Sequence, residues 1–128
     1  MINERVKYTA NTGMVRISTA NAGLDGSGTV GTVITGASNG TLIQTVIIKA
    51  SGAHVTRGMV RLFINNGSST TNLLQEVEIP TIYPSGIDHS FETTINLNYN
   101  LKSGYRLYAS TENAETFDVT AIGLDYAY

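Results

Sequence analysis

Short runs in which apolar and polar residues alternate make up most of this chain. The clearest run is "SFETTINLNY". One side of it carries the apolar residues Phe91, Ile95, Leu97 and Tyr99. An alternation with a period of two is typical of a β-strand that has one face on a core and one face in water. The pattern therefore predicts strands rather than helices.

The same alternation, followed along the whole sequence, predicts eight strands. They are expected at Gly13–Thr19, Thr29–Thr35, Thr41–Lys49, Met59–Asn65, Leu73–Ile79, Ser90–Tyr99, Tyr105–Ser110 and Thr116–Leu124. The dipeptides Asn39-Gly40 and Asn66-Gly67 supply the positive φ of hairpin turns. We therefore predict an all-β fold, a two-sheet antiparallel β-sandwich of about eight strands. It forms a single domain over residues 13–128, preceded by an N-terminal arm or edge strand over residues 1–12.

One predicted strand, "TLIQTVIIK", is apolar on both faces. Strict alternation places Leu42, Val46 and Ile48 on one side. It places Ile43 and Ile47 on the other. Such a strand is expected at the centre of a sheet, or under a neighbour that covers its second face.

Composition excludes several classes of partner. Of the 128 residues, 14% are charged and the net charge is -2, so no basic field is present to hold a nucleic acid. No segment approaches the roughly 18 apolar residues of a membrane span, and "MINERVKYTANTGMVRISTA" lacks the apolar run of a secretory signal. The expected protein is soluble and made in the cytoplasm. The sequence contains no cysteine, so its stability comes from packing or from partners.

The segment "TANAGLDGSGTVGTVITG" contains Gly26-x-Gly28-x-x-Gly31, the letter pattern of a dinucleotide-binding loop. That pattern works only where a buried strand precedes it and a helix begins within it. The residues that follow Gly28, "TVGTVIT", are β-branched and favour a strand. We therefore predict a glycine-rich connection between two strands and no nucleotide site.

Residues that bind metals are sparse. Asp25 and Ser27 offer oxygens to calcium, but the alternating acids and closing glutamate of a calcium loop are missing. His54 and His89 are the only histidines, and their spacing does not match a zinc motif. We predict no metal ligand and no cofactor.

Groups of residues that could form a catalytic site are equally sparse. Asp88, His89 and Ser90 are consecutive in an extended segment, where neighbouring side chains point to opposite sides and cannot form a relay. The segment "STENAETFDV" contains three acids, Glu112, Glu115 and Asp118. They match the carboxylate pair of a glycosidase only in residue type, because their turn is expected to be exposed. Tyrosines such as Tyr126 and Tyr128 fit either a sugar platform, an interface or a cover for a sheet edge. We therefore predict no catalytic residue and no enzyme.

Four segments carry a resemblance to a known group of proteins. They are "RISTANAGLDGSGTVGTVITGASNGTLIQTVIIKASG", "GMVRLFINNG", "EVEIPTIYPSG" and "LKSGYRLYASTENAETFDVTAIGLDY". From about Arg16 onward, the chain resembles small virion structural proteins of tailed bacteriophages. The resemblance implies a jelly-roll-like sandwich on the outside of the phage particle, and none of the matching segments is a catalytic motif.

The expected function is therefore that of a non-enzymatic virion protein that decorates or stabilises the capsid exterior. Its expected partners are the major capsid protein or other virion proteins and further copies of itself, with no nucleic acid and no membrane. An alternative is a tail- or fibre-associated module for host adsorption or carbohydrate binding, which would use exposed tyrosines. A weaker alternative is a small hydrolase built on Asp88 or His89.

Overall fold

The chain forms eight β-strands and no helix in the part that the structure describes. The structure is a computed structural model and describes residues 7–52 and 54–127. The strands are β1 (Lys7–Ile17), β2 (Gly31–Thr35), β3 (Thr41–Ala50), β4 (Gly58–Asn65), β5 (Thr71–Ile79), β6 (Glu92–Leu101), β7 (Arg106–Thr111) and β8 (Phe117–Ala127). All eight predicted strands are present, with boundaries that differ by a few residues.

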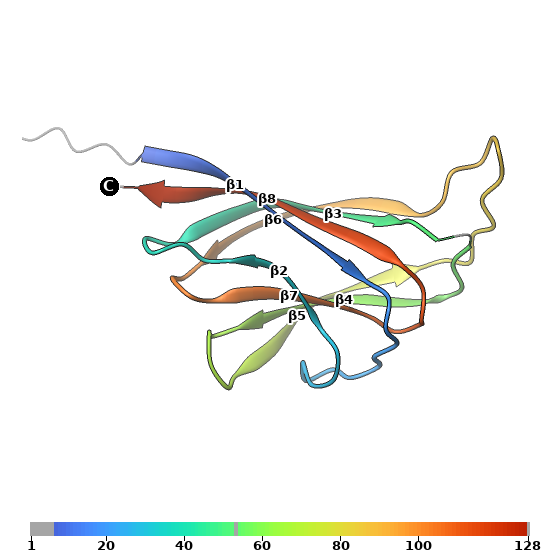
Figure 1. Cartoon of the computed structure of the whole chain (residues 1–128), viewed down its shortest axis with the longest axis horizontal. Helices are drawn as coiled ribbons and strands as arrows, with labels where there is room; N and C mark the ends of the chain where they lie inside the picture. The colour runs from blue at the N-terminus through green and yellow to red at the C-terminus, as the bar shows by residue number, and fades with distance from the viewer. Residues whose placement is uncertain (1–6, 53, 128) are drawn as a thin grey trace, which may run out of the picture.

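Two four-stranded antiparallel sheets pack face to face (Figure 1). Their strand orders are β1-β8-β3-β6 and β2-β7-β4-β5. The first strand thus pairs with the eighth, the second with the seventh, the third with the sixth and the fourth with the fifth. This nested pairing is what results when one long antiparallel ribbon rolls up, and it is the jelly-roll topology. The predicted sandwich is confirmed.

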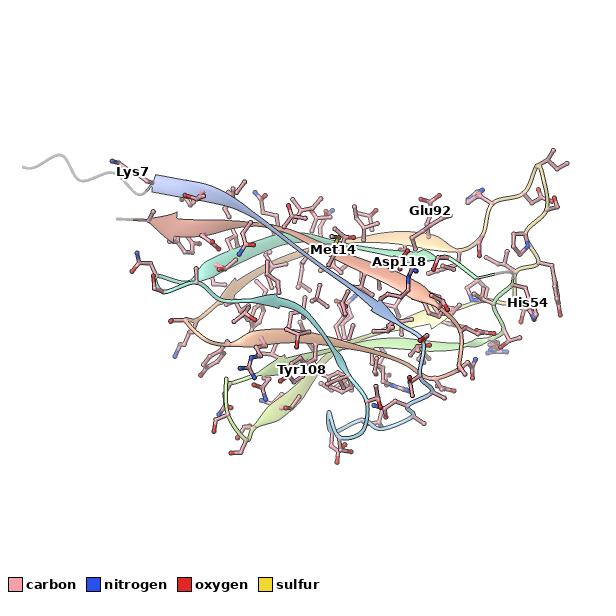
Figure 2. All side chains as sticks on the ribbon, in the orientation of Figure 1. Lys7, Met14, His54, Glu92, Tyr108 and Asp118 are labelled. Carbon is pink, nitrogen blue, oxygen red and sulfur yellow. The ribbon has the colours of Figure 1, made fainter. Side chains whose placement is uncertain are left out.

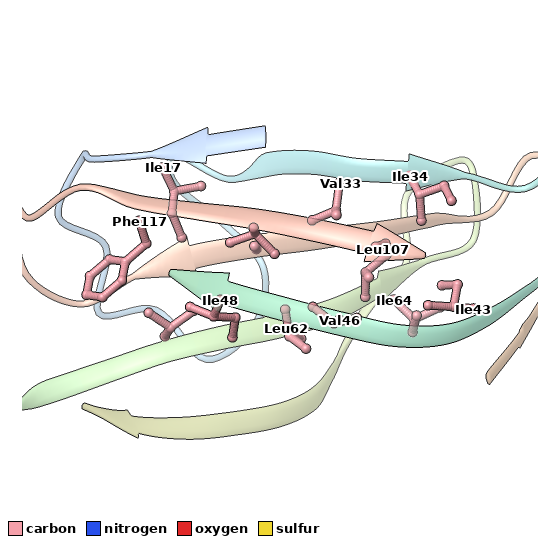
Figure 3. Packing of buried hydrophobic residues seen from close by; sticks show 14 of the residues in the cluster. Ile17, Val33, Ile34, Ile43, Val46, Ile48, Leu62, Ile64, Leu107 and Phe117 are labelled. Carbon is pink, nitrogen blue, oxygen red and sulfur yellow. The ribbon is translucent and has the colours of Figure 1, made fainter. Parts of the chain in front are cut away.

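The core lies between the sheets and is built from aliphatic side chains with one aromatic ring at its end (Figure 3). Val60 and Leu62 of β4 are fully buried there. The alternating residues of β6 pack against the same core, but only partly buried, because β6 is an edge strand. The partly buried residues are Ile95, Leu97 and Tyr99 of β6 and Phe91 directly before it.

The two faces of β3 are not those that strict alternation predicted. A β-bulge between Ile43 and Thr45 shifts the register against both neighbouring strands. Ile43 therefore points into the core with Val46 and Ile48, and Leu42 lies on the opposite face with Ile47. An inserted residue reverses the alternation on one side of a bulge, which corrects the prediction for Leu42 and Ile43. The central position of β3, between β8 and β6, is as expected.

The first strand begins earlier than its sequence pattern indicated. Residues 7–12 continue β1 and pair in register with β8, from Lys7 opposite Ala127 onward. Their side chains are mostly exposed because β1 is an edge strand, so they show no apolar alternation. Of the predicted segment 1–12, this part is an edge strand, and residues 1–6 lie outside the described residues.

The long connection between β1 and β2 crosses the outer face of the β2-β7-β4-β5 sheet. At one end, the Asn21 N–H donates to the Thr111 carbonyl oxygen on β7, 2.8 Å away. Further along, Gly26 packs directly on the Thr71 side chain at the start of β5. On this outer face of the sheet, Phe63 of β4 points away from the core and is nevertheless fully buried. Figure 1 shows the light-blue connection on that side of the sheet.

The two glycines that the sequence predicts in turns both adopt the positive φ of such turns. Gly67 has a φ of 80° in the hairpin between β4 and β5, and Gly40 has a φ of 92° before β3. The turn at Gly40 joins strands of different sheets, so it is not a hairpin turn as predicted. The positive φ is confirmed at both glycines.

Candidate functional surfaces

The glycine motif is a structural loop. Gly26 and Gly28 have φ values of 81° and 77°, and Gly31 already belongs to β2. The Asn21 side chain holds the loop closed, donating from Nδ2 to the carbonyl oxygens of Ser27 at 2.9 Å and Thr29 at 2.8 Å. A strand, and not a helix, follows the motif, so no helix N-terminus faces a phosphate position. The arrangement agrees with the predicted strand-to-strand connection.

Asp25 serves the same loop. Its Oδ1 accepts hydrogen bonds from the Ser27 hydroxyl at 2.6 Å and from the Ser27 N–H at 3.0 Å. The hydroxyl bond, and after it the backbone bond, hold the pKa of Asp25 below its usual value. Within residues 7–52 and 54–127, no three histidine, aspartate or glutamate side chains gather in a way that could hold a metal ion.

The residues of the Asp88-His89-Ser90 segment have separate surroundings. Asp88 Oδ2 accepts from the Ser85 hydroxyl at 3.3 Å, and His89 Nε2 lies 3.5 Å from Glu92 Oε1. The Ser90 hydroxyl is buried without a partner among the described residues. Nothing in this geometry orders an Asp–His–Ser relay.

His54 also lies apart from any group of ligands. Its ring stacks on Tyr83, with centroids 5.1 Å apart and planes inclined by 20°. Figure 2 places His54 among the loops at one end of the sandwich. The backbone bridge between Val55 and Ile82 holds these two loops together there. The stacked pair therefore joins loops rather than forming a site.

The three acids near the start of β8 are not an exposed carboxylate pair, and each is tied to a different part of the chain. Glu115 accepts from the Thr56 N–H and hydroxyl, and Asp118 binds Arg16 through two hydrogen bonds of 2.7 and 3.1 Å. Glu112 Oε1 lies 3.2 Å from Arg61 Nη2. The predicted solvated turn is corrected: these acids are half-buried anchors of loops and strands.

Arg61 is a buried charge that the sequence analysis did not identify. It lies on the covered outer face of β4, where its side chain is 9% exposed. Its Nε donates to Glu76 Oε1 at 3.0 Å, and its Nη1 has no partner among the described residues. Recognising it from sequence requires the β4–β5 register, which places Arg61 opposite Glu76.

Tyrosines occupy two different surroundings. Tyr126 donates to Asn100 Oδ1 at 2.5 Å and packs on Tyr8 with ring centroids 5.5 Å apart, so these two tyrosines cover the outer end of a sheet. Tyr128 lies outside the described residues. Tyr99 and Tyr105 instead line a groove of about 290 Å³ beside the β4–β5 hairpin. The groove is also lined by Asn66, Thr70, Asn72, Leu73, Leu74 and Ile64.

The outer face of the β1-β8-β3-β6 sheet combines an apolar centre with a row of charges. Ile122 of the central strand β8 is 40% exposed at this centre, and Met14 of the edge strand β1 is 79% exposed beside it. Three partly exposed aliphatic residues on the two central strands extend this centre: Leu42, Ile47 and Leu124. At one end of the face, the register aligns four side chains of alternating charge across the four strands: Arg16, Asp118, Lys49 and Glu92. Figure 2 labels Met14, Asp118 and Glu92 on this sheet.

No protein-family model matches the chain, and no curated protein matches it. The part of the chain that the structure describes has no helix long and apolar enough to cross a membrane. The function is therefore inferred from the surfaces themselves.

Proposed function

We propose that this protein is a non-enzymatic structural component of a tailed-phage particle, which decorates or stabilises the outside of the capsid. The observation that carries the proposal is the outer face of the β1-β8-β3-β6 sheet, where Ile122 of the central strand β8 and Met14 of the edge strand β1 expose apolar surface. Contiguous exposed apolar surface marks sites of protein association. A subunit that works by packing against other subunits needs such a face and needs no active site.

Two further features support an assembly role. The jelly-roll topology occurs in viral capsid domains, although it also occurs in lectins and enzymes, so the fold alone does not assign the function. The segments "TANAGLDGSGT", "GMVRLF" and "GYRLYASTENAETFDVTAIGLDY" resemble phage virion proteins in kind and order. The expected partners are the major capsid protein or other virion proteins.

The mechanism of stabilisation is thermodynamic linkage. A subunit that binds the assembled shell, and not its separated components, adds its binding free energy to the assembled state. Many copies on a symmetric lattice add many such contributions. The shell then resists heat and internal pressure without any covalent step.

The test compares phage particles that carry the protein with particles from which its gene is deleted. Deleted particles are expected to assemble, to release DNA at a lower temperature than complete particles, and to recover when purified folded protein is added. Complete particles are the matched control, because their sites are filled and they should bind no further labelled protein. Equal thermal release from both particles, with no binding to the deleted ones, contradicts the proposal.

A second candidate function, host adsorption or carbohydrate binding, is favoured by the groove that Tyr99 and Tyr105 line. Tyrosine rings offer apolar faces, and the amides of Asn66 and Asn72 offer hydrogen-bond donors and acceptors for sugar hydroxyls. Glycan-array binding that is lost in Tyr105→Ala and kept in Tyr8→Ala supports this candidate. Tyr8 is the matched control because it is 53% exposed on a different surface. Location of the protein only at a tail tip, with shells equally stable without it, also favours this candidate over decoration.

A further inference from the structure

We propose that the protein forms a two-fold symmetric dimer in which the outer face of the β1-β8-β3-β6 sheet packs against the same face of a second copy. The proposal goes beyond the capsid role, because it names a contact between copies of this chain that exists with or without a shell. In this dimer the second copy covers the face, so the contact with the shell falls on another surface of the subunit. It stands on the composition of this face and on the order of its charges.

The apolar part of the face lies where the centre of an interface is expected. Leu42 and Ile47 belong to β3, and Ile122 and Leu124 belong to β8, the two central strands of the sheet. The residues aligned with them on the edge strand β6 are polar, namely Thr94, Asn96 and Asn100, so a polar rim lies along β6. On the edge strand β1, the aligned residues are polar Thr12 and Ala10, and the exposed Met14 lies on the same face. An apolar centre with a polar rim is the usual anatomy of a protein interface.

The charged row identifies the occupant as a second copy. Its order across the sheet is Arg16, Asp118, Lys49, Glu92, with alternating signs. A two-fold axis parallel to the strands, between β8 and β3, brings the row against its own reversed copy. Arg16 then faces Glu92 of the second copy, and Asp118 faces Lys49. All four positions meet an opposite charge, and the strands of the two sheets stay aligned, as in face-to-face sheet packing.

The other possible two-fold axis is disfavoured by the same four charged residues. A two-fold axis along the row itself, perpendicular to the strands, would place each charge against the same charge of the second copy. Like charges brought together at an interface cost several kcal/mol. The order of the row therefore selects both the partner and the direction of the axis.

One charge of the row, that of Lys49, has no opposite charge beside it in the described part of its own chain. Lys49 Nζ contacts a backbone oxygen, that of Ser90 at 3.3 Å, and no carboxylate among the described residues lies within ion-pair distance of it. The interface supplies its counter-charge from Asp118 of the second copy. Asp118 keeps its own contact with Arg16, so the four residues and their copies form one network.

Charge exchange tests the pairing. Sedimentation velocity over a range of concentrations should show wild-type protein as a dimer. Arg16→Glu and Glu92→Lys should each weaken dimerisation about tenfold or more, because each creates two like-charge contacts. The double variant R16E/E92K should recover most of the affinity, and an equal mixture of the two single variants should form heterodimers. A monomeric wild type, a trimer, or a double variant no better than the single ones overturns the proposal.

An apolar substitution tests the centre of the face independently. Ile122→Lys should give a monomer that keeps the folded circular dichroism spectrum, since Ile122 is already 40% exposed. Ile87→Lys is the matched control, because Ile87 is 94% exposed on a loop outside this face, and it should remain dimeric. Dimerisation that Ile122→Lys leaves intact overturns the proposal. A dimer that does not restore deleted particles refutes the capsid role alone, and a monomer that restores them refutes this inference alone.

Discussion

The Glu115 carboxylate accepts hydrogen bonds from the N–H of Thr56 at 2.9 Å and from its hydroxyl at 2.8 Å, which joins the β7–β8 connection to the β3–β4 loop. Asn113 strengthens the junction by donating to the Thr56 hydroxyl and to the Arg57 carbonyl oxygen. Two loops separated by almost sixty residues are thus fixed to each other by one carboxylate and one amide. This junction positions one end of the sandwich.

We expect Glu115→Ala to lower the free energy of unfolding by about 1–3 kcal/mol, because it leaves the half-buried Thr56 N–H without its charged acceptor. Urea denaturation measures the change. Glu78→Ala is the matched control, since Glu78 is exposed and its nearest guanidinium nitrogen is 3.9 Å away, and it should change stability by less than about 0.5 kcal/mol. Equal effects of the two variants would show that the junction contributes nothing.

The sequence was sufficient to predict the strands because their signal is local. Alternation in β6 and β4 and the glycines at the turns each lie within a few residues of one another. The bulge in β3 could not be seen this way, since "TLIQTVIIK" is apolar at almost every position and fits more than one register. Residues 7–12 gave no alternation because an exposed edge strand has no buried face.

The candidate surfaces could not be predicted, because they depend on register between distant strands. Arg16 and Asp118 meet only through the β1–β8 pairing, and Lys49 joins the same row only through β3–β8. Phe63 is fully buried although it lies outside the core cluster, and no pattern around Phe63 indicates this burial. Local patterns determine which segments are strands, and long-range pairing determines which charges meet.

We expect Leu62→Ala to cost about 2–5 kcal/mol of stability, because Leu62 is fully buried between the sheets and its removal leaves a cavity. Denaturant unfolding followed by circular dichroism measures the cost. Leu24→Ala is the matched control, since Leu24 is more than half exposed on the β1–β2 connection. A cost below about 1 kcal/mol for Leu62→Ala would place that residue outside the core.

Gly26→Ala is expected to destabilise the protein, for two separate reasons. Gly26 has a φ of 81°, and a Cβ there would lie 2.3 Å from Thr71 Cγ2. The loop must therefore lift from β5, at a cost of about 1 kcal/mol or more. Hydrogen exchange at the amide of Thr71, on whose side chain Gly26 packs, should accelerate in the variant.

Gly86→Ala provides the contrast for Gly26→Ala. A Cβ at Gly86 meets nothing within 4 Å, and this glycine is not among those with positive φ. The substitution should be neutral or stabilise by up to about 1 kcal/mol through the unfolded state. If both alanines behaved alike, the loop would not be packed on β5 as the structure shows.

Acid should weaken the contact between Arg16 and Asp118. The Arg16 guanidinium holds the pKa of Asp118 below the usual pKa of an aspartate, which is about 4. An acid with a lowered pKa in the folded state contributes stability above its unfolded pKa and loses it as pH falls through the folded pKa. The stability difference between wild type and Asp118→Asn should thus be constant above about pH 5 and vanish at lower pH.

The same difference should shrink in high salt. Asp118 is 38% exposed, so about 1 M salt screens much of its attraction to Arg16. The measurement requires protein concentrations at which the chain is monomeric, because Asp118 also belongs to the proposed dimer face. A difference that grows as pH falls would contradict the assigned direction of the pKa shift.

The last prediction concerns the buried Arg61 and its two acids. The arginine side chain is 9% exposed, whereas those of Glu76 and Glu112 are 39% and 36% exposed. Removing the arginine leaves carboxylates that water still reaches, so Arg61→Met should cost only about 1–2 kcal/mol. Replacing both acids, in E76Q/E112Q, leaves an uncompensated charge with little access to water and should cost about 3 kcal/mol or more. The triple variant R61M/E76Q/E112Q removes that charge and should be more stable than E76Q/E112Q. Urea denaturation of the three variants measures this order, and an arginine substitution that costs more than the loss of both acids would show that burial does not control the energetics of the cluster.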